Sequence, residues 1–292
     1  MNETPHTVVS IGALTSVGQI REHNEDDFII IPDVIDTETR EGENSFVLGQ
    51  GGCFLVVADG MGGAAAGEIA SQSTTKYIKK FLAANRYSYP SPTEIKHVFE
   101  QLIVQSHQNL QLIIQQPPEY KGMGTTIVMA WVINYTAYVC WVGDSRCYHY
   151  RPLRGTIVAT EDHSWVMEMV KKGHLSLEEA ATHEYRNIIT QCLGDSANPP
   201  KPDFVSINLE KGDKILLCSD GLNTMISDVD INWHLSQTVN LSLTLQQLIN
   251  AANQAGGEDN VTVAILEFLE KPLRENRTSR RSVWGKLKNI FQ

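Results

Sequence analysis

Short apolar runs bounded by polar and glycine-containing turns recur along the chain and predict β-strands. The run from Thr126 to Ile133 is apolar at successive positions, which is typical of a strand covered on both faces. Asn134-Tyr135 then predicts a turn into the next strand. The predicted strands are Thr7–Leu14, Phe28–Ile31, Phe54–Ala58, Thr126–Ile133, Ala137–Val142, Cys147–Arg151, Lys214–Cys218 and Val261–Phe268.

Helical periodicity is confined to a few stretches. One apolar face comprises Ile69, Tyr77, Ile78, Phe81 and Leu82, and a second comprises Ile95, Val98, Phe99, Leu102, Ile103, Leu110, Ile113 and Ile114. Pro90-Ser91-Pro92 separates the two helices, Thr93 is the expected N-cap of the second, and Pro117-Pro118 ends it. A third helix is predicted over Leu243–Ala255. Residues 33–52 predict a surface loop or an extended hairpin, and residues 161–186 carry only weak helical signals.

The order of these elements indicates the fold class. Strands follow one another in hairpin order, and the long helices are grouped together. This order favours a layered α/β body with antiparallel sheets over a doubly wound parallel sheet. No linker precedes about residue 270, so we expect one domain over residues 1–270 and an appended segment over 271–292.

Charge and composition disfavour several classes of function. The net charge of −10 is uneven, since residues 271–292 carry +6 and leave −16 on residues 1–270. An acidic body repels phosphate backbones, so we expect no nucleic-acid partner. No run approaches the roughly 18 apolar residues of a membrane span, and the first ten residues do not resemble a secretory signal. The five cysteines form no C-x-x-C pair, so we expect reduced thiols in a cytoplasmic protein.

Four aspartates stand at the tips of apolar strands: Asp59, Asp144, Asp220 and Asp259. An isolated Asp-Gly is a common turn dipeptide, but the occurrence of four aspartates at strand tips favours a shared site. The strands of one sheet would bring these tips together, and clustered carboxylates repel one another unless a cation neutralises them. Mg²⁺ or Mn²⁺ suits an all-oxygen site, to which the Gly60 carbonyl could add a ligand.

Other candidate groups carry weaker signals. Arg21 is a candidate clamp for a phosphate, although taken alone it is better explained as an exposed surface residue. The glycines of residues 60–63 lack the Gly-Lys-Ser/Thr ending of a P-loop. His163 is either an acid–base group or a structural hydrogen-bonding residue, and we favour the structural role. Cys218 lies inside an apolar strand and is expected to pack rather than react.

Seven short motifs occur in order along the chain. They are Arg21-Glu-His-Asn-Glu25-Asp26, Asp59-Gly-Met-Gly-Gly-Ala-Ala-Ala-Gly67-Glu68-Ile-Ala-Ser71, Gly124-Thr-Thr126, Gly143-Asp-Ser-Arg146, Asp162-His-Ser164, Ser219-Asp-Gly-Leu222 and Glu258-Asp-Asn-Val-Thr262. The series resembles that of the metal-dependent protein phosphatases (PPM family, type 2C-like) in their compact bacterial form. The resemblance covers residues 8–268.

This resemblance implies a four-layer sandwich, in which two packed antiparallel sheets are flanked by helices on both sides. It also implies two Mg²⁺ or Mn²⁺ ions at one end of the sandwich, with a weaker third. The implied roles follow the motifs. Asp59 bridges the metals, the Gly60 carbonyl, Asp220 and Asp259 complete their ligands, Asp144 joins Asp220 at the third metal, Glu25 and Asp26 hold metal-bound waters, Asn260 lies beside the ligands, and Arg21 binds phosphate.

The implied activity is hydrolysis of phosphoserine and phosphothreonine monoesters in proteins by a metal-activated water, without a protein nucleophile. Many eukaryotic members carry a proposed general acid, His, where this chain has Met61, so we expect a metal-bound water to protonate the leaving group. Residues 161–186 correspond to the mobile flap of bacterial members. We expect a monomer that opposes a bacterial Ser/Thr kinase.

Two alternatives stay open. The same fold could serve as a catalytically silent module that binds phosphoproteins or a kinase, but the presence of Asp59, Asp220 and Asp259 favours an enzyme. A nuclease would need a basic groove, which the acidic body disfavours. The basic segment 271–292 interleaves apolar and charged residues. It is either a short amphipathic helix that contacts an acidic partner or membrane surface, or a solvated terminus.

Overall fold

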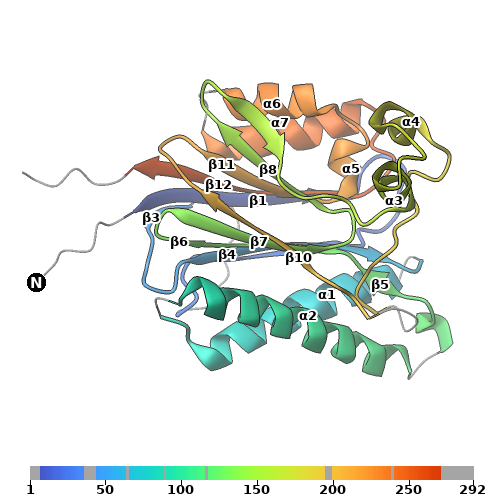
Figure 1. Ribbon diagram of the computed structural model, residues 1–292, viewed down its shortest axis with the longest axis horizontal. Coiled ribbons are helices and arrows are strands. Elements are labelled where there is room, and N and C mark those ends of the chain that lie inside the picture. Colours follow the sequence, from blue (N-terminus) through green and yellow to red (C-terminus); the bar gives the residue numbers. More distant parts are fainter. Residues whose placement is uncertain are drawn as a thin grey trace, which may run out of the picture.

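The computed structural model describes residues 7–35, 44–63, 66–88, 90–115, 118–194, 199–237 and 240–270. Two antiparallel β-sheets pack face to face, and helices cover the outer face of each (Figure 1). This is the four-layer sandwich that the resemblance implied. The basic segment 271–292 lies outside the described residues.

Strand order defines two sheets, A and B. Sheet A has the order β3-β1-β12-β11-β8-β9, and sheet B has the order β10-β7-β6-β4-β2, with β5 paired to β4. Sheet A contains β1 (Val8–Ser16), β3 (Asn44–Val47), β8 (Arg146–Arg151), β9 (Gly155–Val158), β11 (Lys214–Cys218) and β12 (Val261–Glu270). Sheet B contains β2 (Asp26–Ile31), β4 (Cys53–Met61), β5 (Gly124–Thr125), β6 (Ile127–Ile133), β7 (Thr136–Val142) and β10 (Asp203–Asn208).

Helices cover the two sheets on opposite sides. The long helices α1 (Ala66–Asn85) and α2 (Pro92–Ile114) pack on sheet B, and α6 (Asp228–Ser236) and α7 (Leu241–Gln254) pack on sheet A (Figure 1). The short helix α5 (Asp220–Asn223) follows β11, whereas α3 (Trp165–Lys171) and α4 (Leu177–Thr182) lie within residues 161–186. A 3₁₀ turn spans Pro118–Tyr120.

Strand alternation distributes side chains between the layers. In β4, Phe54 and Val56 face the helices α1 and α2, while Leu55 and Val57 face sheet A. All seven residues of β6 are buried, which confirms the prediction of a strand covered on both sides. This continuous apolar filling holds the sheets together, because removing apolar surface from water is the dominant favourable term in folding.

The structure corrects several predictions. The N-cap of α2 is Ser91, not Thr93, and Pro92 occupies the first helical turn. Ser91 and Glu94 form a reciprocal capping box, which satisfies backbone donors at the helix start. The apolar pattern missed the short strands β3, β5, β9 and β10 and the helices α5 and α6. The edge strand β10 is half exposed, so it carries no continuous apolar run.

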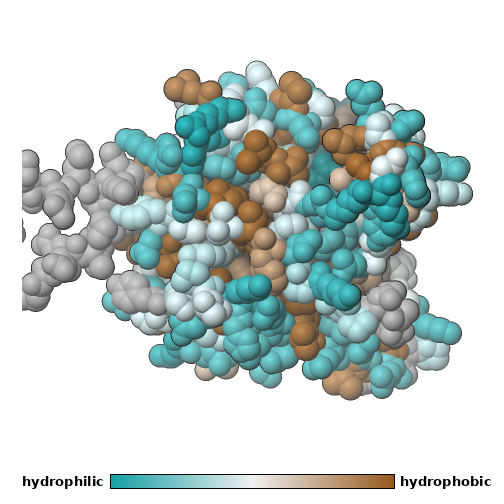
Figure 2. Space-filling view, viewed as in Figure 1, coloured by the Kyte–Doolittle hydropathy of each residue, from teal (hydrophilic) through white to brown (hydrophobic). Residues whose placement is uncertain are grey.

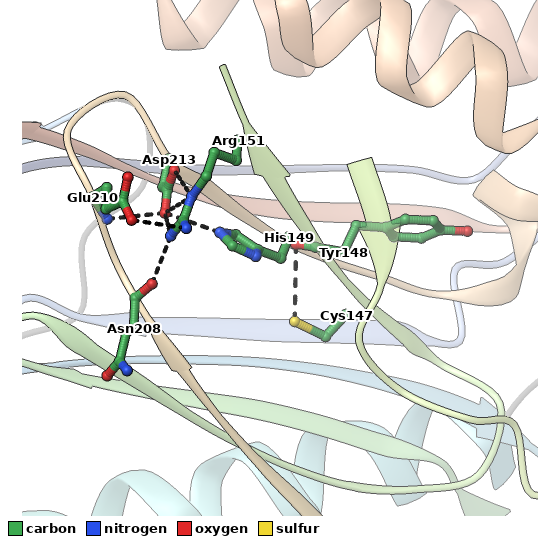
Figure 3. Close-up of polar contacts among 7 residues, drawn as sticks. All are labelled: Cys147, Tyr148, His149, Arg151, Asn208, Glu210 and Asp213. Atoms are coloured by element: carbon green, nitrogen blue, oxygen red, sulfur yellow. Dashed lines mark hydrogen bonds and ion pairs between the residues drawn. The ribbon is translucent and has the colours of Figure 1, made fainter. Parts of the chain in front are cut away.

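A buried ionic network ties the β10–β11 connection to β8 (Figure 3). The Asp213 carboxylate is fully buried and accepts hydrogen bonds from Arg151 Nε (3.0 Å) and Nη2 (2.6 Å). It also lies 3.0 Å from His149 Nε2 and accepts the backbone N–H of Glu210 at 2.9 Å. This network lies at the C-terminal end of β8, and Arg146 lies at the N-terminal end of the same strand.

Within the described ranges, no helix is long and apolar enough to cross a membrane. Figure 2 shows hydrophilic side chains over most of the visible face, with apolar side chains in separate patches.

Candidate metal-dependent active site

A cavity of about 440 Å³ opens at one end of the sandwich. We call it the acidic cavity, and its lining includes Arg21, Glu25, Asp59, Gly60, Asp144, Asp220 and Asp259. The expectation that the four aspartates meet at the edge of one sheet is wrong. Asp59 and Asp144 extend from β4 and β7 of sheet B, whereas Asp220 and Asp259 adjoin β11 and β12 of sheet A. Packing of the two sheets brings these residues together.

Asp59 is positioned by its backbone. Its N–H donates to Thr126 Oγ1 (3.3 Å), and its carbonyl accepts from the Thr125 hydroxyl (2.9 Å) and the Thr126 N–H (2.9 Å). Asp26 is its antiparallel partner in β2. The Gly124-Thr125-Thr126 motif therefore anchors the strand that carries Asp59.

Asp26 is deeply buried behind the cavity. Its Oδ2 accepts a hydrogen bond from Ser219 Oγ (2.7 Å), and Ser219 Oγ in turn accepts the Thr262 N–H (2.9 Å). The other oxygen, Oδ1, is buried and has no hydrogen-bond partner among the described residues. A buried oxygen in this state is costly unless another donor or a cation satisfies it.

Asn260 fastens the loop that carries Arg21 and Glu25. Its Oδ1 accepts the Glu25 N–H (2.7 Å), and its Nδ2 donates to the carbonyls of Val17 and His23 (both 2.9 Å). Asn260 is 3% exposed, so these bonds are shielded from water. It acts as a positioning residue that contacts backbone groups.

Two glycines of the motifs are required for steric reasons. A Cβ on Gly60 would lie 2.1 Å from the Gly67 carbonyl oxygen and 2.6 Å from that of Glu25. A Cβ on Gly221, next to Asp220, would lie 2.0 Å from the Asn260 carbonyl oxygen. Only glycine permits these backbone approaches, which bring the acidic loops to the same cavity.

The carboxyl groups of the cavity raise one another's pKa. Burial, followed by the nearby Asp26, Asp220, Asp144 and Asp259, raises the pKa of Asp59 well above its ordinary range. Burial is also the largest cause that raises the pKa of Asp144 and Asp220, and neighbouring carboxylates add to it. The carboxylates that line the cavity therefore carry more negative charge than the Arg21 guanidinium can neutralise.

The donor set fits hard divalent cations. It consists of carboxylates and a backbone carbonyl, the oxygen ligands that Mg²⁺ and Mn²⁺ prefer, and the unsatisfied Asp26 Oδ1 lies beside it. As the side chains of the described residues stand, no three His, Cys, Asp or Glu groups form a ready-made ligand set. Asp259 instead pairs with Arg21, with 2.7 Å between Nη2 and Oδ2.

The remaining predicted groups are also placed. Arg21 lines the mouth of the cavity, about half exposed, and Met61 lines the wall. His163 is buried, accepts the Gly143 N–H at Nδ1 (3.1 Å) and lies 3.2 Å from Asp203 at Nε2. This double attachment supports the structural role favoured for His163. Cys218 is fully buried in β11, as expected for a packing residue.

Sequence reasoning assigned no role to several lining residues, among them His23, Asn187 and Ile189. His23 lies in the first of the seven motifs, two residues after Arg21, so its position was a usable signal. Asn187 and Ile189 also line the cavity. They directly follow residues 161–186 in sequence. No local pattern marks them, because only the path of the folded chain after this segment brings them to the cavity.

Comparisons with known proteins agree with this architecture. The family model "Protein phosphatase 2C" matches residues 43–269. Protein phosphatase PhpP of Streptococcus pneumoniae is 34% identical over 265 residues, which cover 90% of this chain and 99% of that protein. The solved serine/threonine phosphatase of S. agalactiae is 36% identical with a TM-score of 0.79, covering 90% of this chain and all of that one.

A further solved structure bears on the metals. The catalytic domain of the serine/threonine protein phosphatase PstP, in complex with two manganese ions, is 27% identical with a TM-score of 0.71. The alignment covers 90% of this chain and all of that domain.

The two-sheet sandwich and its carboxylate-lined cavity define a metal-dependent protein phosphatase. The chain belongs to the protein phosphatase 2C family. It is a protein serine/threonine phosphatase of the kind found in bacteria.

Proposed function

We propose that this phosphatase hydrolyses phosphoserine and phosphothreonine monoesters in proteins at a centre for two Mg²⁺ or Mn²⁺ ions. Asp59, the Gly60 carbonyl, Asp220 and Asp259 would hold the pair, and Asp144 with Asp220 would hold a weaker third ion. The observation that carries the proposal is the gathering of these carboxylates from both sheets into one cavity beside Arg21.

When bound, such ions lower the pKa of a coordinated water and so supply a nucleophile at neutral pH. The chain's own residues then have separable tasks. Arg21 binds the phosphate oxygens at the cavity mouth, where a guanidinium can donate two parallel hydrogen bonds. Glu25 and Asp26 would accept hydrogen bonds from metal-bound waters, and Asn260 holds the Glu25 backbone in place.

The chain offers no proton donor at Met61, since a thioether carries no exchangeable proton. No side-chain nucleophile is required for this chemistry, and the fully buried Cys218 is shielded from substrate. These features support direct attack by water over a covalent intermediate.

Purified protein with and without Mn²⁺, assayed with p-nitrophenyl phosphate and a phosphothreonine peptide, tests the proposal. We expect metal-dependent turnover of both substrates. Complete silence at saturating Mn²⁺ in folded protein would contradict it.

A phosphomonoester in a protein requires a kinase that forms it, so we propose that this enzyme opposes a bacterial Ser/Thr kinase in the cytoplasm. The five free thiols of the chain support a reducing compartment. Comparing phosphoproteomes with and without the gene tests this: phosphoserine and phosphothreonine sites should accumulate in its absence.

A further inference from the structure

A second cavity of about 480 Å³ adjoins the acidic cavity. The two share Asp144, Asn187 and Asp220 in their linings. We call the second one the flap cavity, because it lies between the flap (residues 161–186) and the helices α5 and α6 of the body. A phosphopeptide whose phosphate enters the acidic cavity must therefore place neighbouring residues close to the flap cavity.

The flap is tied to the body at its base. The Trp165 N–H donates to the Ile188 carbonyl (2.8 Å), and the Thr190 N–H donates to the His163 carbonyl (2.7 Å). Arg146 holds Asp162 through two hydrogen bonds, from Nε to Oδ1 (2.8 Å) and from Nη2 to Oδ2 (2.6 Å). The flap therefore starts and ends at fixed points beside the cavity.

Aromatic packing orders the interior of the flap. The ring of Trp165, at the start of α3, lies 5.2 Å from that of His183 and 5.4 Å from that of Tyr185. These contacts join α3 to the segment that follows α4. The wall that the flap presents to the cavity is therefore a packed structure.

The two walls of the flap cavity differ in chemistry. The wall from the body is polar and includes Asp144, Asp220, Asn223, Thr224 and Asp228. The wall from the flap is mainly apolar, with Val166, Met167, Leu177, Ala180 and Ala181, and it also includes Asp162 and Arg186.

Some of the charged groups that line the flap cavity have partners. Arg146 of the body and Asp162 of the flap neutralise each other, and Asp228 accepts a hydrogen bond from the Tyr148 hydroxyl (2.9 Å). Val166 and Ala180 are buried, yet Leu177 is 65% exposed at the rim. An apolar group that covers Leu177 gains the free energy of removing both apolar surfaces from water. Apolar side chains lie exposed at the end of the molecule where α3 and α4 lie (Figures 1 and 2).

We propose that the flap cavity is a subsite for an apolar side chain, of the leucine or methionine class, two positions from the phosphorylated residue of the substrate. In an extended peptide, side chains at positions i and i+2 point to the same side and lie about 6.6 Å apart along the chain. The phosphate and this side chain thus enter adjacent cavities together. This inference rests on the proposed function and extends it to substrate selection.

The test uses phosphoserine peptides with alanine at all flanking positions and one Leu, Lys or Asp placed at each position from −3 to +3. We expect Leu at −2 or +2 to raise kcat/KM about tenfold over Ala, the scale of discrimination that apolar pockets achieve. Peptides carrying a non-hydrolysable phosphonate in place of phosphoserine, measured by fluorescence polarisation, should show the same preference in binding.

Two variants test whether the flap cavity causes the preference for Leu. Leu177→Ala shortens the apolar wall and Ala181→Leu fills the cavity, so each should reduce the gain from Leu to about twofold or less. Leu112→Ala is the matched control, because Leu112 is 63% exposed on α2 and does not line the cavity. Turnover of p-nitrophenyl phosphate, which has no flanking residues, should stay unchanged in all three variants.

Equal kcat/KM for every flanking residue would overturn the proposal, as would a preference for Lys directed at Asp228. A Leu preference that persists in both Leu177→Ala and Ala181→Leu would overturn it as well. Loss of all phosphate hydrolysis in the wild type would instead contradict the proposed function, and phosphonate-peptide binding would still decide the subsite.

Discussion

The ionic network around Asp213 gives a prediction that separates stability from catalysis. Asp213→Asn keeps the shape of the side chain but removes the charge that Arg151 and His149 face. Because the carboxylate is fully buried and the Arg151 side chain is only 16% exposed, the substitution breaks a buried ion pair. Breaking such a pair costs about 3–5 kcal/mol.

Glu210→Gln provides the matched control. Glu210 also pairs with Arg151, at 2.9 Å, but its side chain is 66% exposed. An exposed pair contributes about 0–1 kcal/mol, so this variant should be close to wild type in stability. The two substitutions change the same charge type beside the same arginine and differ in burial.

Urea unfolding followed by tryptophan fluorescence measures both variants, and p-nitrophenyl phosphate turnover measures their activity. We expect kcat at 25 °C to stay within about twofold of wild type. Arg151 stands five residues along β8 from Arg146 at the active-site end, which is about 17 Å in an extended strand. A loss in Asp213→Asn no larger than that in Glu210→Gln would refute the burial argument.

The same pair has a signed pH dependence. Burial alone would raise the pKa of Asp213, but hydrogen bonds from Arg151, the Glu210 backbone and His149 hold that pKa below its ordinary value of 3.8. The stabilisation is therefore fully present above about pH 4 and is lost as the pH falls through the lower, folded-state pKa. The stability gap between wild type and Asp213→Asn should be constant near neutral pH and narrow below pH 4. A gap that widens in acid would contradict this sign.

Four further outcomes follow from the active site. Asp59→Asn should lower kcat by about 100-fold or more, because the implied bridging ligand loses its charge, and Mn²⁺ titration of turnover checks it. Arg21→Ala should raise KM about tenfold, with Arg21→Lys intermediate; an unchanged KM would exclude the phosphate-binding role. Asn260→Ala should cost about 2–4 kcal/mol of unfolding free energy, through three lost hydrogen bonds, and should lower kcat/KM by misplacing Glu25; a purely structural residue would lower stability alone. Removing divalent ions with EDTA should abolish turnover, and Mn²⁺ should restore it; turnover that survives EDTA would contradict metal dependence.

Much of the fold can be predicted from local patterns of apolar and polar residues. The predicted strand Lys214–Cys218 coincides with β11, and the predicted helix Leu243–Ala255 overlaps α7. These elements are central or amphipathic, so burial leaves a clear apolar signature. The edge strands β9 and β10 lack one, because their pairing depends on neighbours supplied by distant parts of the chain.

The identity of the acids follows from the ordered motifs, but their meeting place does not. Asp26 and Ser219 are 193 residues apart in sequence and in hydrogen-bond contact in space. The role of His163 became clear only from its bonds to Gly143 and Asp203. The ordered motifs identify the candidate site residues, whereas the packing of the two sheets and the path of the chain after residues 161–186 create the cavities. Local sequence cannot encode such cavities, since their walls come from segments that contact one another only in the folded state.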